Sequence, residues 1–555
     1  MVTFADLHDL KPGPIRAAGD SWLDLSNTSA QLTEETTHDL LGPSHRSGWK
    51  GDAANAAFGQ LDKIDDEFEL FGKQARLVSV TLHGAADRLG ALQRQLHDTV
   101  VRATAAGMRV RDDGTVEARL RTSAELAAMP EHEQERRLQH DVMEADTVQR
   151  ELHDVVKQAA DFDSALTAVL NRLVPLDPGA MSEREWLDEQ QDAAQVASLL
   201  GLDPGAVPPA GSKPADAKAW WDNLSPDDRA LYLAAYPDRV GTLDGLPSNV
   251  RDDANRQKLR DDIVMMRAGQ WPSGTPHGGA DTLETANRLL DRLEQSEYDD
   301  NPDHRLYLLK VDNTGDGRAI IALGNPDTAA HTGVLVPGVN TELGDFNGQL
   351  GRLQAIQQSA NGYYNGNTAM IWWLDYDAPE ADLDSPSSWM TAVNSDRAVE
   401  GAGRLQNFDL GLSTSHNGGS TDLTVIGHSY GSTVVGNASS TGDGLHANNV
   451  IVLGSPGMDV GSVDDLQMDK THFYAGAATD DPISYIGDVS TVANWLGIDG
   501  GHGADPASAP FGGNVLDIDT AGHSGYWTAN SKSLNSQGAI IAGVPNQANL
   551  YSEAS

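Results

Sequence analysis

The sequence contains no cysteine among its 555 residues. This absence excludes disulfide bonds, thiolate metal sites and a cysteine nucleophile. It leaves the redox compartment open, because a chain without cysteine is stable in reducing and oxidising surroundings alike. Nucleophilic catalysis by this chain would therefore need a different side chain.

Basic residues are scarce: 39 Lys and Arg stand against 81 Asp and Glu, which gives a formal net charge of −42. The acidic residues are spread along the chain rather than gathered in a tail. Nucleic acids and anionic membrane surfaces both need a basic footprint on their partner, so neither is expected to bind. We interpret the excess as a solubilising acidic surface.

Long apolar runs are also missing. No stretch approaches the length of about 18 apolar residues that would span a bilayer, so no transmembrane segment is expected. Residues 1–9 have neither a basic n-region nor an apolar h-region, and no Sec signal is expected there. The sequence leaves localisation open between the cytoplasm and export without a Sec signal.

The first 175 residues are predicted to form an all-helical bundle. A first helix carries Trp22, Leu25 and Leu32 on one face, and glycines between residues 42 and 51 break it. Two further helices are predicted from apolar residues spaced three and four apart. Their stripes are Phe58, Leu61, Ile64, Phe68, Phe71, Ala75, Val78, Leu82, Ala85, Leu89, Leu92 and Leu96, and then Leu138, Val142, Ala145, Leu152, Val156, Ala159, Phe162, Leu166, Val169 and Leu173. We expect these helices to form one antiparallel bundle with its own core, linked by a small hairpin over 109–116.

Residues 176–303 are predicted to be a linker and helical connector, and residues 304–555 a catalytic α/β domain. In the latter, strand-like apolar runs alternate with spacers of helix length. The runs are Leu306–Val311, Ala319–Leu323, Gly333–Val336, Ala369–Leu374, Leu423–Ile426, Val450–Leu453, His472–Tyr474 and Val515–Ile518. They predict a mostly parallel sheet of about eight strands.

The most informative motif is Gly-His-Ser-Tyr-Gly over residues 427–431. An apolar run precedes it and a run of small residues that can form a helix follows it. Strand, sharp turn and helix are the context of a G-x-S-x-G nucleophile elbow, in which a strained turn exposes the serine. Ser429 is therefore the predicted nucleophile.

A serine hydroxyl needs a histidine to remove its proton and a carboxylate to orient that histidine. In the chain order Ser, Asp, His, each partner follows a late strand. Asp481 lies after the strand candidate at 472–474 and is the predicted acid, with Asp480 as its rival. His523 follows the last strand candidate in a glycine-flanked loop and is the predicted base, with His502 as its competitor. His428 is expected to be structural or to line the pocket.

An oxyanion hole needs two backbone N–H groups near the nucleophile. One is expected from Tyr430, the residue after the serine. The other is expected from the Pro337-Gly338 loop, where Val339 is the preferred donor and Asn340 the next.

Three other motifs receive structural interpretations. Gly-Asp-Ser at 19–21 has no strand before it and is expected on a helix surface. The loop at 312–317 has some calcium-loop character, but it joins two strands and lacks the EF-hand glutamate, so a hairpin turn is predicted. The segment 375–379 fits pocket lining and plain loop geometry equally well. No metal and no organic cofactor is predicted.

Several stretches together resemble an actinobacterial α/β-hydrolase family long catalogued as a domain of unknown function. They are Trp-Trp-Asp-Asn-Leu-Ser-Pro at 220–226, Pro-Asp-Arg-Val-Gly-Thr-Leu-Asp-Gly-Leu-Pro at 237–247, Arg-Asp-Asp-Ala-Asn-Arg at 251–256, Val-Pro-Gly at 336–338, the 427–431 motif and His-Ser-Gly-Tyr at 523–526. The resemblance covers roughly residues 215–530. It implies a serine-hydrolase fold and triad without implying a substrate.

Trp49-x-Gly51, between two predicted helices, is similar to the WXG-type hairpins of type VII secretion proteins. The Tyr-x-x-x-Asp/Glu signal that follows such hairpins is absent, because the first tyrosine of the chain is Tyr232. The resemblance is confined to this short motif, and a helical stalk within one chain or a dimer explains the same pattern.

The sequence thus predicts a serine hydrolase that cleaves an ester or related acyl bond of a small or lipid-like substrate. The alternative is a secretion-associated or helix-pairing protein whose hydrolase fold is a non-catalytic scaffold and whose bundle self-associates. Acyl chain length, the choice among ester, thioester and amide, and the oligomeric state are not predicted.

Overall fold

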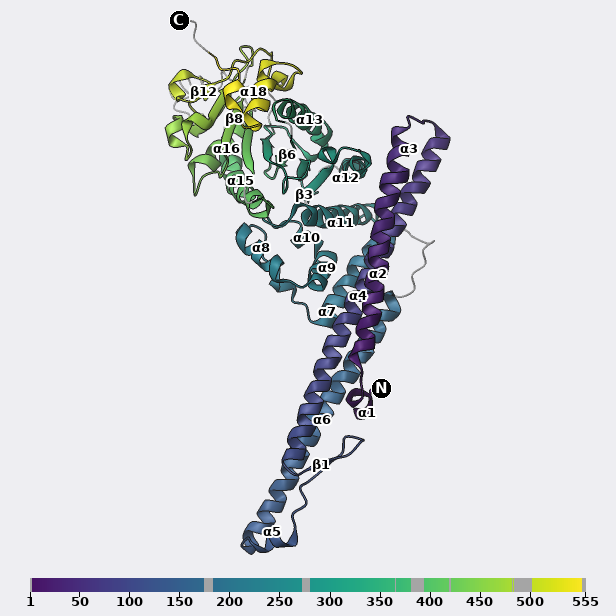
Figure 1. Cartoon of the computed structure of the whole chain (residues 1–555). Coiled ribbons are helices and arrows are strands. Elements are labelled where there is room, and N and C mark those ends of the chain that lie inside the picture. The colour runs from purple at the N-terminus through teal and green to yellow at the C-terminus, as the bar shows by residue number, and fades with distance from the viewer. Residues whose placement is uncertain are drawn as a thin grey trace. The chain divides into compact units, whose positions relative to one another are not determined.

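The computed structural model describes residues 2–173, 183–271, 280–364, 366–380, 394–418, 421–481, 483 and 502–551. Contacts divide the chain into two compact units, and each is described by itself (Figure 1). The first unit holds residues 1–41, 49–204 and 226–235, and the second holds 42–48, 205–225 and 236–555. Residues of the expected connector contribute to both units. The three functional domains of the sequence analysis stay a prediction.

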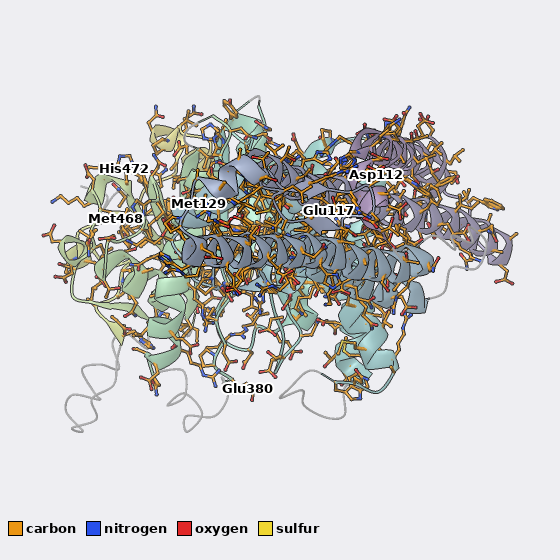
Figure 2. All side chains as sticks on the ribbon, turned by 90° about the horizontal axis from the view of Figure 1, so that it is seen from below. Asp112, Glu117, Met129, Glu380, Met468 and His472 are labelled. Carbon is orange, nitrogen blue, oxygen red and sulfur yellow. The ribbon has the colours of Figure 1, made fainter. Side chains whose placement is uncertain are left out.

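Helices build the first unit. They are α1 (Phe4–His8), α2 (Pro12–Glu35), a π-helical turn (Thr36–Leu41), α4 (Asp52–Ala105), α5 (Ser123–Ala127), α6 (Glu131–Leu173), α7 (Glu183–Leu200) and α9 (Pro226–Ala235). The predicted hairpin is present as β1 (Arg109–Val110) and β2 (Val116–Glu117), which pair antiparallel. Arg111 pairs with Glu117 across it, and Glu117 is labelled in Figure 2.

The expected packing of the long helices is found between the C-terminal half of α4 and the part of α6 from Ala145 onward. Arg102 near the end of α4 pairs with Glu151 of α6 at 2.8 Å. The core between them contains Leu7, Ala85, Leu89, Leu92, Leu96, Leu152, Val155, Ala159 and Phe162. This unit therefore has a hydrophobic core of its own.

The apolar face predicted for the first helix is not its packing face. Leu25 and Leu32 are 45% and 37% exposed. Instead, α2 approaches α4 through small side chains: Ser26 Oγ donates to the carbonyl of Gly72 at 2.8 Å, and Ser29 Oγ donates to that of Phe68 at 2.7 Å. The predicted first helix is present as α2, but small residues make its contact with α4, and the two leucines lie off that contact.

The start of the predicted α6 stripe is also exposed, since Leu138 and Val142 are 41% and 51% accessible. The reason is the length of the partner helix. Ala103, near the end of α4, clusters with Ala145, so residues before Ala145 lie beyond α4. Periodicity marked the face of α6 correctly but could not show where its partner ends.

An eight-stranded sheet forms the centre of the second unit. Its strands are β3 (Leu306–Asp312), β4 (Arg318–Leu323), β5 (His331–Val336), β6 (Thr368–Leu374), β7 (Asp422–His428), β8 (Asn449–Leu453), β10 (Phe473–Gly476) and β12 (Asn514–Val515). The order across the sheet is β12-β10-β8-β7-β5-β6-β4-β3. The pairs that β4 forms with β3 and β6 are antiparallel, and the other pairs within this sheet are parallel. All eight predicted strands are confirmed, as is the α/β class.

Two short strands were not predicted, β9 (Gly457–Val460) and β11 (His502–Gly503), which pair parallel outside the main sheet. The other helices of the unit are α3 (Gly42–Arg46), α8 (Pro214–Asn223), α10 (Pro237–Val240), α11 (Ser248–Arg267), α12 (Ala280–Gln295), α13 (Phe346–Tyr363), α15 (Asp396–Ser415), α16 (Gly431–Ser440) and α18 (Lys532–Ile541). Among the helices in the described ranges, none combines the length and the apolar character needed to cross a membrane.

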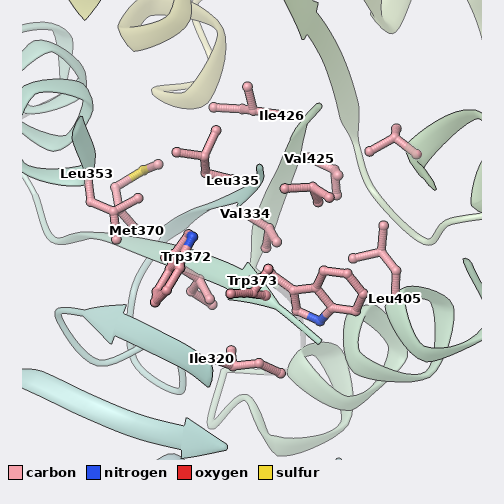
Figure 3. Packing of buried hydrophobic residues seen from close by; sticks show 14 of the residues in the cluster. Ile320, Val334, Leu335, Leu353, Met370, Trp372, Trp373, Leu405, Val425 and Ile426 are labelled. Atoms are coloured by element: carbon pink, nitrogen blue, oxygen red, sulfur yellow. The ribbon is translucent and has the colours of Figure 1, made fainter. Parts of the chain in front are cut away.

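Helices cover both faces of the sheet: α13 packs on α18, and α15 packs on α16 (Figure 1). Adjacent residues of β6 point to opposite faces, as in any strand. Figure 3 shows Met370 directed toward Leu353 of α13 and Trp373 toward Leu405 of α15. These side chains are fully buried. The sheet therefore lies between two apolar layers of helices, which hold its strands in place.

Side chains of α11 satisfy the outer edge of β3. Asp252 Oδ1 accepts the N–H of Leu308 at 2.7 Å, and Asn255 Nδ2 donates to the carbonyl of Leu308 at 3.1 Å. Arg256 Nη2 donates to the carbonyl of Leu306 at 3.0 Å. An uncovered edge strand would invite pairing with another chain. The Arg-Asp-Asp-Ala-Asn-Arg stretch thus protects the sheet edge.

Asp409, a buried carboxyl on α15, has an unusual pKa that can be tested. Burial raises the pKa of its carboxyl to about 7, although one oxygen accepts the N–H of His446. Its other oxygen has no hydrogen-bond partner in the described part of the chain. The unfolded chain ionises this group near its ordinary pKa, so stability is lost as pH rises from about 4 to about 7.

Asp409→Asn is therefore expected to stabilise the protein, by on the order of 2 kcal/mol at pH 8 and by less at pH 5.5, because asparagine cannot ionise. Denaturant unfolding at both pH values measures this difference. A stabilisation that is equal at the two pH values would contradict the assignment of a raised pKa.

Candidate active site

Ser429 occupies a sharp turn between β7 and α16, as the sequence predicts. Its φ is +55°, in the left-handed region that is strained for a residue with a side chain. A Cβ on Gly431 would lie 2.2 Å from the carbonyl oxygen of Val336, and one on Gly427 would lie 2.7 Å from the Cα of Ser432. Both glycines of the motif are thus required by close backbone approach, and the turn holds the serine at the end of the strand.

The predicted acid and base are in contact. His523 Nδ1 lies 3.0 Å from each carboxylate oxygen of Asp481. The Asp481 side chain is fully buried, whereas that of His523 is 18% exposed. A carboxylate that accepts a hydrogen bond from Nδ1–H favours the imidazole tautomer in which Nε2 carries no proton. Nε2 can then take a proton from another group. This arrangement suits a general base.

Two further donors hold the Asp481 carboxylate. Tyr526 donates its hydroxyl to Oδ2 at 2.5 Å, and the N–H of Ile483 donates to Oδ1 at 3.0 Å. Burial alone would raise the pKa of Asp481, but the hydrogen bonds from His523 and Tyr526 outweigh it and keep the pKa below its ordinary value. The group therefore stays ionised at neutral pH despite being buried.

The rival residues have other partners. Asp480 Oδ1 accepts the N–H of Gly522 at 2.8 Å, which fastens the loop that carries His523. His502 Nδ1 lies 2.8 Å from Asp459, and its side chain is buried. Neither rival lines the cavity that holds Ser429.

Ser429 and His523 open onto one cavity of about 450 Å³. Its walls are formed by Gly338, Val339, Asn340, Thr341, Asp345, Gly348, Gln349, Arg352, His428, Ser429, His523 and Ser524. Within the described residues, no hydrogen bond joins Ser429 Oγ to His523. Catalytic hydrogen bonds are often long without substrate and tighten only when it binds. The cavity thus brings together the predicted nucleophile and base, with several polar side chains among the residues that line it.

The loop after β5 approaches the serine closely. A Cβ on Gly338 would lie 2.5 Å from the Cβ and 2.8 Å from the Oγ of Ser429, so only glycine leaves space there. Tyr376, which is fully buried, donates its hydroxyl to the carbonyl of Pro337 at 2.5 Å and fixes the loop. The backbone at Gly338 therefore forms one wall beside the hydroxyl.

The amide groups of this loop differ in their availability. The N–H of Asn340 donates to the carbonyl of Pro379 at 3.0 Å and is thereby occupied. The N–H groups of Val339 and Tyr430 have no acceptor among the residues that the structure describes. The role of Val339 and Tyr430 as oxyanion donors stays a prediction.

His428 lines the cavity, as expected, and also supports the base. Its Nε2 donates to the backbone carbonyl of His523 at 2.9 Å, and the two rings lie 4.7 Å apart. Burial, with repulsion from His523, lowers the pKa of His428 to about 3. His428 is therefore neutral near pH 7 and holds the His523 backbone rather than moving protons.

Sequence reasoning missed three residues of this site: Tyr526, Tyr376 and Arg352. Tyr526 had a usable signal, because it lies three residues after His523 within the His-Ser-Gly-Tyr stretch. Tyr376 lies in the 375–379 segment, which was left open between pocket lining and loop geometry, and its bond to Pro337 was not foreseen. Arg352 gave no signal, since its contacts depend on how α13 packs against the loops.

The other motifs have structural roles. Asp312 Oδ1 accepts the N–H of Thr314 at 3.0 Å in the turn between β3 and β4, as predicted for a hairpin. Asp20 lies within α2, as expected. Across the described ranges, one cluster has metal-ligand spacing, His140, Asp141 and Glu144, and its buried Asp141 is paired with Arg121 at 2.9 Å. That pairing accounts for the cluster without an ion.

Tyr526→Phe is expected to destabilise the protein by about 1.5–3 kcal/mol, because it removes a hydrogen bond to a buried carboxylate. Denaturant unfolding measures the loss. Tyr551→Phe is a matched control, since Tyr551 is 62% exposed. Equal stabilities of the two variants would contradict the bond from Tyr526 to Asp481.

Comparisons with known proteins agree with this architecture. A family model described as alpha/beta hydrolase matches residues 312–491. Uncharacterized protein Rv2079 of Mycobacterium tuberculosis H37Rv is 31% identical over 403 residues, which cover 63% of this chain and 60% of that protein. Uncharacterized protein Rv0963c of the same strain is 30% identical over 268 residues, 46% of this chain and 89% of that protein. The chain belongs to this α/β-hydrolase family. No solved structure matches it.

The α/β-hydrolase match includes Ser429 and Asp481 but ends before His523. The structure brings His523 to Asp481 from beyond the matched segment. The chain spans about 60% of the length of Rv2079, and that relative is uncharacterized. The likeness of the N-terminal hairpin to WXG-type proteins stays a prediction.

Proposed function

We propose that this α/β-hydrolase is a serine hydrolase that cleaves an ester or related acyl bond through a covalent acyl-enzyme. The observation that carries the proposal is the contact of His523 Nδ1 with both Asp481 oxygens at 3.0 Å, on a cavity that Ser429 also lines. The strained φ of Ser429 supports it, because such strain is typical of a nucleophile elbow.

In the proposed first step, Ser429 Oγ attacks the acyl carbonyl carbon while His523 Nε2 takes the hydroxyl proton. Asp481 accepts the Nδ1 proton in a hydrogen bond and stabilises the imidazolium that forms. The developing oxyanion accepts hydrogen bonds from the amides of Tyr430 and Val339. Collapse of the tetrahedral intermediate breaks the bond to the leaving group, which receives its proton from His523.

In the second step, water attacks the acyl-enzyme while His523 takes a proton from it. Collapse of the second tetrahedral intermediate releases the acid, and His523 returns the proton to Ser429 Oγ.

The cavity bears on the class of substrate. A volume of about 450 Å³ suits a small molecule, and its walls include Asn340, Thr341, Gln349 and Ser524. A polar acyl compound fits such walls better than a long unbranched acyl chain, which would leave polar groups without partners.

A panel of 4-nitrophenyl esters with acyl chains of graded length tests the proposal. The expected result is hydrolysis that saturates with substrate concentration, is highest for short chains and is inhibited by a fluorophosphonate. Rates equal to those of buffer for every ester, together with no fluorophosphonate adduct, would rule the hydrolase proposal out.

A second candidate function is helix pairing by the first unit. The observation that favours it is a set of exposed apolar side chains, Leu25, Leu32, Leu40 and Trp49, of which Leu40 and Trp49 are both 51% exposed. Sedimentation of the wild type and of a Leu25→Ser, Leu32→Ser variant tests it. A monomeric wild type would exclude self-pairing.

A further inference from the structure

Arg352 on α13 presents a guanidinium to the wall of the cavity. The residue is half-buried, and its Nη1 donates to Gln349 Oε1 at 3.2 Å. Its guanidinium carbon lies 4.3 Å from the ring centroid of Trp527. A guanidinium that stacks on an indole uses its face for that contact. Its remaining N–H groups, which lie in the plane, are left to bind a ligand.

The Arg352 guanidinium has no carboxylate partner among the residues that the structure describes. Within the part of the chain that the structure describes, no Asp or Glu oxygen lies within 4.0 Å of it. Acidic residues outnumber basic ones by 81 to 39 in this chain, which makes an unpaired arginine in a cavity notable. Asp345 lies on the same wall, but its Oδ2 accepts the N–H of Glu342 at 3.0 Å. Burial lowers the pKa of Arg352, and attraction to Asp345 offsets this only in part.

The position of Arg352 links it to the reacting groups. The Trp527 ring beneath it lies 4.9 Å from the ring of His428, which in turn lies 4.7 Å from the ring of His523. Trp527, on which Arg352 stacks, is therefore connected to the proposed base His523 through the ring of His428. Ser429 and Arg352 line the same cavity, so a small substrate whose carbonyl lies at Ser429 can also contact Arg352.

We propose that Arg352 selects substrates in which an anionic oxygen group, a carboxylate or a phosphate, lies a few bonds from the scissile acyl carbonyl. A planar guanidinium binds either group through paired N–H donors. In a protein with a net charge of −42, a cation held inside the cavity favours binding of an anion there rather than elsewhere on the surface. The inference rests on the proposed hydrolase function and names its substrate class.

Three 4-nitrophenyl esters of matched chain length test the inference: the pentanoate, the hemiglutarate and the ester with a terminal phosphonate in place of the carboxylate. They differ at the end of the acyl chain, which is methyl, carboxylate or phosphonate. After subtraction of the spontaneous rate, kcat/KM is expected to be at least about tenfold higher for one anionic ester than for the pentanoate. The difference between the two anionic esters identifies the preferred group.

Substitution assigns the preference to the residue. Arg352→Gln is expected to lower the ratio of anionic to neutral kcat/KM by about tenfold or more, mainly through KM, and Arg352→Lys is expected to restore part of it. Arg88→Gln, at an exposed position on α4, is the matched control and should keep the wild-type ratio. A merely structural Arg352 would lower all three rates together and leave the ratio unchanged.

The outcomes separate this inference from the proposed function. If Ser429 reacts with a fluorophosphonate and the pentanoate is hydrolysed, but the ratio is near one or is the same in Arg352→Gln, the inference alone is overturned. If no ester is hydrolysed and no adduct forms on Ser429, the proposed function fails and the inference fails with it.

Discussion

Ser429→Ala is expected to lower ester hydrolysis by at least about four orders of magnitude, because it removes the attacking oxygen from the proposed mechanism. The change deletes one oxygen atom, and no hydrogen bond of that Oγ is present among the described residues. The melting temperature should therefore change little. Initial rates with the best short-chain ester, together with a thermal melt, measure both quantities.

Ser440→Ala is the matched control for this variant. Ser440 lies at the end of α16, and its hydroxyl donates to the carbonyl of Gly436 within the same helix at 2.8 Å. It should keep near wild-type activity. Activity above a few per cent in folded Ser429→Ala would remove Ser429 from the mechanism.

Asp481→Asn is expected to lower kcat by about four orders of magnitude, while Asp480→Asn costs little. An asparagine at position 481 would present an N–H either to His523 or to Tyr526. The first orientation favours the wrong imidazole tautomer, and the second loses the hydrogen bond from Tyr526; both remove the charge that stabilises the imidazolium. An asparagine at position 480 could still accept the N–H of Gly522 through its own Oδ1, as Asp480 does at 2.8 Å. Steady-state kinetics of both variants give the comparison.

The two aspartates are adjacent and differ by one position in the loop, so each variant serves as the control for the other. Reversed effects would mean that Asp480 orients the base when substrate is bound. Equal and small effects would mean that neither carboxylate takes part in proton transfer.

The strands and the elbow were predictable from the sequence because their causes are local. The central strands β5 and β6, for example, are short runs whose residues are almost all buried on both faces. The turn at Ser429 requires glycines at 427 and 431, since β5 and α16 approach so closely there. The contact of Asp481 with His523 followed from the chain order of such sites once these strands were located.

Exposure was less predictable, because it depends on what lies opposite a helix face. Leu25 and Leu138 fit the apolar periodicity of their helices yet are 45% and 41% exposed. Serines of α2 supply the contact with α4 in the first case, and α4 ends too early in the second. The pattern defines a face, whereas tertiary structure decides whether that face is covered.

Long-range hydrogen bonds were beyond sequence reasoning for the same reason. The choice of Val339 over Asn340 as oxyanion donor depends on the bond from Asn340 to Pro379. The cavity position of Arg352 depends on its stacking on Trp527, about 175 positions along the chain. Neither contact leaves a local pattern.

The central claim is that Ser429 is a nucleophile activated by His523 and Asp481. The most direct measurement is to treat the full-length protein with a fluorophosphonate and to locate the adduct by peptide mass spectrometry, with Asp481→Asn treated in parallel. The account predicts one modified residue, Ser429, and labelling that is much slower in Asp481→Asn. An unmodified Ser429, or an adduct on any other residue, would contradict it.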